Sequence, residues 1–87
     1  MKTMKRIYKK NDMIVWEDQK DNSNSCHLYS ISEYNWIGVV TINNLDTTIG
    51  EYSTKKHAFK MLQIAMEKLG YTIELWKKLQ FSRIRKR

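Results

Sequence analysis

The 87-residue sequence has no proline, only three glycines and a single cysteine. With so few residues that break helices and strands, it contains no segment typical of a linker, and its length suits one domain. Cys26 has no partner for an internal disulfide, which indicates a reducing compartment. No apolar run approaches the roughly 20 residues of a membrane span, and residues 1–10 lack the apolar core of a secretion signal. We therefore expect a cytoplasmic protein.

Charges of one sign are missing from long stretches of the chain. The net charge is +7, yet neither residues 1–10 nor residues 77–87 contain an acid. Conversely, there is no Lys or Arg between Asp21 and Thr54, so the Asp and Glu residues of this stretch have no cation among them. The sequence therefore predicts two basic ends and an acidic middle.

Short apolar segments in this middle predict β-strands, because they are rich in β-branched and aromatic residues and are separated by polar turns. Strands are expected at residues 13–18, 26–34, 36–43 and 47–53, with turns at 21–25 and 43–46. Alternation in the second strand places Cys26 and His27 on opposite faces. The third strand is apolar on both faces, which predicts a covered, central position.

The spacing of apolar residues changes to three and four after residue 54, which predicts a helix over about 54–69 with one stripe facing the sheet. The stripe consists of Ala58, Phe59, Leu62, Ala65, Met66 and Leu69. Ser53 or Thr54 suits the N-cap, and Gly70 suits a left-handed residue after the last turn.

These elements predict a single α+β domain over residues 1–87, in which one helix packs on a small antiparallel sheet of three to five strands. Residues 1–10 form a basic N-terminal segment, residues 11–76 the core and residues 77–87 a basic tail. Residues 71–75 fit a further strand. The stretch after it fits a short basic helix or an extended tail.

Residues 35–71 resemble the AP2-like domain of plant transcription factors, phage homing endonucleases and integrase arm-binding modules. The shared features are a strand that begins with Trp36, the run Ile49-Gly50-Glu51-Tyr52 ahead of Thr54, and a helix with Ala58 early and Leu69-Gly70 at its end. A similar order of residues recurs in small phage-encoded proteins. The resemblance implies a strand–helix unit and an origin in a phage or mobile element. That family reads DNA with Arg and Trp side chains of its sheet, but the corresponding strands here contain no Arg or Lys, so none of its contact residues is assigned.

The sequence offers no catalytic set, no metal site and no cofactor motif. No nucleophile, base and acid occur at a suggestive spacing. Cys26 and His27 are adjacent potential ligands, but no second pair follows at zinc spacing. We therefore expect a protein that is not an enzyme, with no cofactor and no metal.

The basic ends are the candidate binding site, because Lys and Arg that neutralise phosphates gain affinity without reading sequence. If the fold brings the ends together, they form one cationic surface. The predicted nucleic-acid-binding residues are Lys77, Lys78, Arg83, Arg85, Lys86 and Arg87, followed by Lys5, Arg6, Lys9, Lys10, Lys55 and Lys56. A solvated tail and a membrane-surface segment at residues 75–81 remain alternatives, and we favour no membrane partner. Tyr29 and Trp36 are candidates for base stacking, although aromatics in so small a domain more often form the core.

Two hypotheses of function follow. The first is a phage- or mobile-element-type accessory protein that binds DNA or RNA through its phosphates, without catalysis. The second is a phage-encoded inhibitor of a host protein or nucleoprotein complex, of the anti-CRISPR or anti-defence kind, whose acidic middle and exposed strand edge form the protein contact. The sequence leaves a homodimer open.

Overall fold

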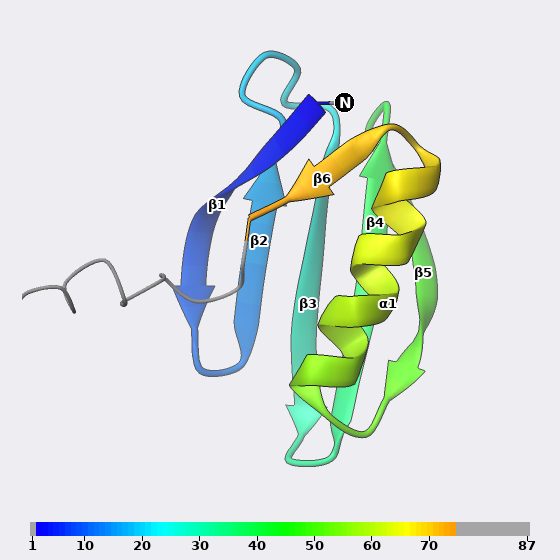
Figure 1. The fold of residues 1–87 in the computed structure, drawn as a ribbon. Coiled ribbons are helices and arrows are strands. Elements are labelled where there is room, and N and C mark those ends of the chain that lie inside the picture. The colour runs from blue at the N-terminus through cyan, green and yellow to red at the C-terminus, as the bar shows by residue number, and fades with distance from the viewer. Residues whose placement is uncertain (1, 75–87) are drawn as a thin grey trace, which may run out of the picture.

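The computed structural model describes residues 2–74, which form six strands and one helix (Figure 1). The elements are β1 (Lys2–Lys10), β2 (Met13–Glu17), β3 (Ser25–Ser32), β4 (Asn35–Ile42), β5 (Leu45–Tyr52), α1 (Lys55–Lys68) and β6 (Tyr71–Ile73). The predicted α+β class is confirmed. The predicted number of strands is wrong, because the sheet has six rather than three to five.

The strands form one sheet in the order β5-β4-β3-β2-β1-β6. From β1 to β5 each strand pairs antiparallel with the next, as expected for a meander. The sheet is nevertheless mixed, because β6 pairs parallel with β1 at Lys2–Met4. Two parallel strands need a crossover connection, and here α1 is part of it.

Sequence reasoning misses β1, because it places residues 1–10 in a basic segment outside the core. Its sequence KTMKRIYKK has little apolar patterning, and Met4 is its one buried residue. The neighbouring strands hold this polar segment in the sheet, since β2 pairs with Lys5–Lys10 and β6 pairs with Lys2–Met4. Tertiary pairing thus overrides a weak local signal.

Helix α1 and strand β6 cover one face of the curled sheet, which we call the helix face (Figure 1). The core between these layers consists of Met4, Ile14, Trp16, Cys26, Leu28, Trp36, Val40, Ala58, Phe59, Leu62, Met66, Tyr71 and Ile73. Trp16 lies under the end of β6, where its indole Nε1 donates to the Glu74 carbonyl oxygen at 3.0 Å. Side chains alternate along each strand, so the other side of the sheet, which we call the opposite face, carries residues such as Val15, His27 and Val39.

The helix is close to its prediction. Thr54 is the N-cap, and its Oγ1 accepts from the His57 backbone N–H at 3.1 Å. Gly70, with φ of +90°, follows the last turn as expected. The buried stripe is narrower than predicted, because Leu69 is exposed. Among residues 2–74 no helix is long and apolar enough to cross a membrane.

Candidate nucleic-acid interface

Strand β1 carries five cations and no acid, the largest charge of any described strand. The structure therefore brings four predicted site residues, Lys5, Arg6, Lys9 and Lys10, onto one strand. The three lysines are exposed and Arg6 is partly buried. Within residues 2–74, the stretch from Lys5 to Lys10 pairs with β2 alone, so it forms an edge of the sheet.

The cations of this edge project from both faces of the sheet. Lys5 and Lys10 project from the opposite face, whereas Arg6 and Lys9 project from the helix face, where Arg6 pairs with the buried Trp16. A register shift just after Arg6 explains why two residues three positions apart share a face. A linear polyanion can therefore approach this edge and meet cations on either side.

The two ends of the described chain meet at β1. The Lys2 backbone N–H donates to the Gly70 carbonyl oxygen at 3.0 Å, and that of Glu74 donates to the Met4 carbonyl oxygen at 3.2 Å. The Glu74 side chain turns back and accepts from the Arg6 backbone N–H through Oε1 at 2.7 Å. Within residues 2–74, the start of β1 and the segment that ends at Glu74 thus lie side by side.

Lys55 and Lys56 open α1, at the end of the sheet where β1 turns into β2 (Figure 1). The first turn of α1 contains no acid, so these cations oppose the helix dipole. Lys55 is half-buried, with its Nζ 5.2 Å from the centre of the Trp36 ring, and Lys56 is exposed. This cation–π contact with Trp36 offsets part of the unfavourable interaction between Lys55 and the positive end of the helix dipole.

A hollow of about 540 Å³ lies beside the start of β1, and it adds two cations that the predicted site did not include. It is lined by Lys2, Thr3, Lys5, Asp18, Gln19, Lys20 and Asp21. Lys2 belongs to the basic N-terminus and could have been chosen from its charge alone. Lys20 lies among acids in the sequence, and only the fold brings it next to β1.

Asp18 fixes the wall of this hollow. The Tyr71 hydroxyl donates to its Oδ2 at 2.7 Å, and the Lys20 backbone N–H donates to its Oδ1 at 2.9 Å. These hydrogen bonds, the one from Tyr71 first, lower the pKa of Asp18. Burial and the neighbouring Asp18 raise the pKa of Tyr71, whose oxygen also accepts from Asn24 Nδ2 at 3.0 Å. The arrangement is structural, because it joins the loop after β2 to β6.

The remaining candidate side chains have structural surroundings. Cys26 lies in the core, where burial raises the pKa of its thiol to about 12, so it is a poor nucleophile. His27 is on the opposite face, as predicted, stacked on Tyr29 at 5.7 Å between ring centres, and burial lowers its pKa. Trp36 is 7% exposed and belongs to the core, so its proposed role in base stacking is not supported. Among residues 2–74, His, Cys, Asp and Glu form no group of three suited to a metal ion.

The rest of the predicted interface lies outside the described residues. This applies to Lys77, Lys78, Arg83, Arg85, Lys86 and Arg87, to the basic helix or tail that contains them, and to the apolar residues considered for a membrane surface. Their connection to the described fold is Glu74, which lies beside β1.

No protein-family model, no curated protein and no solved structure gives a significant match to this chain.

Proposed function

We propose that this protein binds DNA or RNA through phosphate contacts centred on β1, without catalysis. The observation that carries the proposal is that both ends of the described chain, Lys2 and Glu74, lie at one strand with five cations and no acid. Nine residues of strand extend over about 30 Å, which is close to one turn of a DNA duplex. Contacts of this kind gain affinity by releasing counterions and require no base readout.

The placement of acids supports a preference for β1 over the rest of the sheet. Strands β3, β4 and β5 contain no Lys or Arg, and β5 carries Asp46 and Glu51. Phosphates are therefore repelled from β5 and attracted to β1. The hollow lined by Lys2, Lys5 and Lys20 offers a place for one phosphate beside the strand, although its two aspartates offset part of the charge.

The test is the salt dependence of binding for the full-length protein and the variant Lys9→Gln/Lys10→Gln. Each lost contact with duplex DNA removes about 0.9 from the slope of log K against log salt, so the variant is expected to lose about 2. The matched control is Lys60→Gln/Lys68→Gln, which removes the same charge from two exposed residues of α1 and is expected to keep the slope.

Two results would contradict the proposal. One is the absence of binding to any DNA or RNA at low salt. The other is an equal loss of slope in both double variants, because total charge rather than the β1 surface would then govern binding.

A second candidate function is contact with another protein, as in an inhibitor of a host protein or nucleoprotein complex. An apolar groove beside the acidic strand β5 favours it. A copurifying protein that remains bound to Lys9→Gln/Lys10→Gln, at salt that releases nucleic acid, would support this function over the first.

A further inference from the structure

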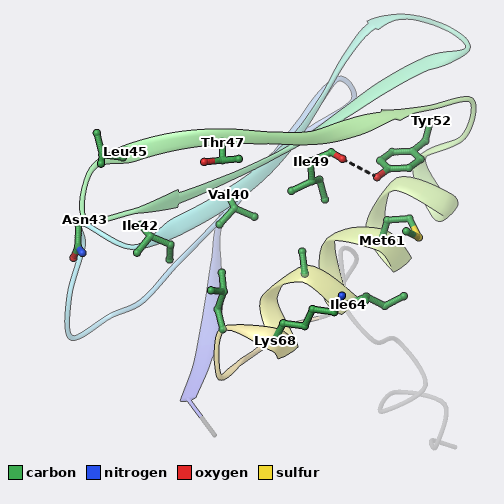
Figure 2. Close-up of a pocket in the computed structure, with 12 residues that line it drawn as sticks. Val40, Ile42, Asn43, Leu45, Thr47, Ile49, Tyr52, Met61, Ile64 and Lys68 are labelled. Carbon is green, nitrogen blue, oxygen red and sulfur yellow. Dashed lines mark hydrogen bonds between the residues drawn. The ribbon is translucent and has the colours of Figure 1, made fainter.

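An apolar groove of about 710 Å³ runs between α1 and the strands β4 and β5 (Figure 2). Figure 2 shows Val40 and Ile49 of the sheet on one side of it and Ile64 and Lys68 of α1 on the other. The lining residues are Val40, Ile42, Asn43, Leu45, Thr47, Ile49, Tyr52, Met61, Ile64, Ala65, Lys68 and Leu69. Among the described residues of this lining, most are apolar, none is acidic, and Lys68 is the one cation.

The groove exists because α1 has a second apolar stripe beside its buried one. Met61, Ile64, Ala65 and Lys68 follow one another at helical spacing and line the groove. No described element covers this stripe, since β5 is the last strand on that side of the sheet. As a result three apolar side chains that line the groove are well exposed: Leu45 by 73%, Leu69 by 50% and Ile64 by 39%.

Strand β5 forms the outer wall of the groove, and one of its edges has no strand partner within residues 2–74. Its pairing with β4 is regular from Leu45 to Thr48, and the register shifts after that. Edge strands are usually protected from further pairing by lysines, prolines or shortness. β5 has eight residues with neither Lys nor Pro, so its regular half, Leu45–Thr48, offers free backbone groups to another strand.

The opposite face of β5 is acidic. Asp46 and Glu51 pair with Thr41 and Ile37 of β4, which lie on the face away from α1. Thr41 Oγ1 donates to Asp46 Oδ1 at 2.6 Å, which fixes that carboxylate at the edge. The cations of β1 are four strand spacings away, about 19 Å, and the Debye length at physiological salt is about 8 Å. The local acids therefore determine which charges the β5 edge attracts.

We propose that β5 and the groove form a docking site for an extended segment of another protein, which adds to the sheet as a strand beside Leu45–Thr48. Side chains of an added strand alternate between the two faces. One set would enter the apolar groove near Ile64 and Leu69, and the other would lie beside Asp46. The partner segment is thus defined by its chemistry: apolar residues alternating with Lys or Arg, and no acid.

This site gives the second candidate function a surface and a partner chemistry, and it does not depend on nucleic-acid binding at β1. The two surfaces lie on different strands at different sides of the sheet. A basic segment is repelled by β1 and attracted by β5, whereas a polyanion behaves in the opposite way. One protein can therefore hold both partners at once.

The test uses full-length protein and a capped ten-residue peptide of alternating valine and lysine, with amide hydrogen exchange as the site-resolved measurement. We expect the peptide to slow exchange within Leu45–Thr48 at least tenfold. Ile64→Lys and Glu51→Lys are both expected to weaken binding about tenfold, by filling the groove with charge and by removing an acid. Glu67→Lys, an exposed helix position outside the groove, is the matched control and should bind as the parent does.

A peptide of alternating valine and glutamate is expected to leave Leu45–Thr48 unprotected, even where it binds at β1. The proposal is overturned if that acidic peptide protects these amides equally, or if the basic one protects none of them. It is also overturned if the protein alone sediments as a dimer whose β5 amides are already protected, because a second copy would then occupy the edge. Lys9→Gln/Lys10→Gln should bind the basic peptide normally, so a failure of this proposal is distinguishable from a failure of nucleic-acid binding.

Discussion

The two sides of the sheet, β1 with β6 and β5 alone, differ both in charge and in how they are attached to the fold. β1 carries five cations, pairs with β6 at Lys2–Met4 and with β2 at Lys5–Lys10, and places Met4 in the core. β5 carries two acids, pairs within residues 2–74 with β4 alone, and leaves most of its side chains exposed. Both sides belong to one small sheet, yet they carry charges of opposite sign.

The two edges of the sheet also differ in whether they carry lysines. In the described part of the chain, Lys5–Lys10 form an edge of the sheet, and lysines at an edge oppose the addition of another strand and favour contact with phosphates. β5 has no such lysine and has an apolar groove along its inner side. Under the two proposals, positive charge disfavours strand addition at the β1 edge, whereas the β5 edge accepts a basic strand.

The largest effect is expected from the residue that attaches β1 to the core. Met4 is fully buried, with its sulfur 3.9 Å from Cys26 Sγ. Met4→Ala should lower the free energy of unfolding by about 2–5 kcal/mol, as large-to-small core changes do. Leu45→Ala on β5, as its counterpart, should change it by no more than about 0.5 kcal/mol, because Leu45 is exposed. Urea unfolding of both variants measures the difference, and equal losses would contradict the contrast between the two strands.

A smaller effect is expected where β5 leads into α1, at one end of the groove. Thr54→Ala removes the N-cap bond to the His57 N–H and should cost about 1 kcal/mol. The neighbouring Ser53→Ala is the matched control, and the midpoint of its thermal unfolding should stay close to that of the parent protein. If the two variants were equally destabilised, the cap would not be Thr54. Neither variant should alter the salt slope of nucleic-acid binding.

The third effect depends on pH, and it concerns the attachment of β6 beside β1. Tyr71 donates to Asp18 and thereby lowers the pKa of that carboxyl. A lowered pKa stabilises the fold above the ordinary value of about 4, and this contribution is lost as pH falls through the folded pKa. Tyr71→Phe should therefore be destabilised at neutral pH, and its difference from the parent should shrink as the pH falls below about 4.

Thermal unfolding across this pH range checks the third prediction. Tyr29→Phe, a half-buried tyrosine on the opposite face, is the control and should show no such trend. A penalty for Tyr71→Phe that stays constant down to low pH would mean that the bond to Asp18 does not carry the effect.

Much of the fold could be predicted from the sequence where the period of apolar residues was clear. The strands β2 to β5 and the helix α1 lie within two residues of their expected bounds. β1 could not be recognised, because one buried residue in nine gives no period and its stability comes from its neighbours. The parallel pairing of β6 depends on contacts distant in sequence, which local patterns do not contain.

The candidate site could be predicted in composition but not in arrangement. Charge alone identified Lys5, Arg6, Lys9 and Lys10, and the structure adds that they share a strand edge. The groove was not predicted, because Met61 and Ile64 fit the helical pattern of apolar residues, and the sequence does not indicate that they are left uncovered. Their exposure follows from where α1 crosses the sheet, and only the fold decides that.

The most direct test of the central claim is a chemical-shift titration of the full-length protein with a short oligothymidylate at low salt. If nucleic acid binds at β1, the largest amide shifts are expected at residues 5–10 and at the adjoining loop residues 18–21, while the signals of residues 45–52 do not move. Shifts concentrated on β5, or none on β1 at saturation, would contradict that claim.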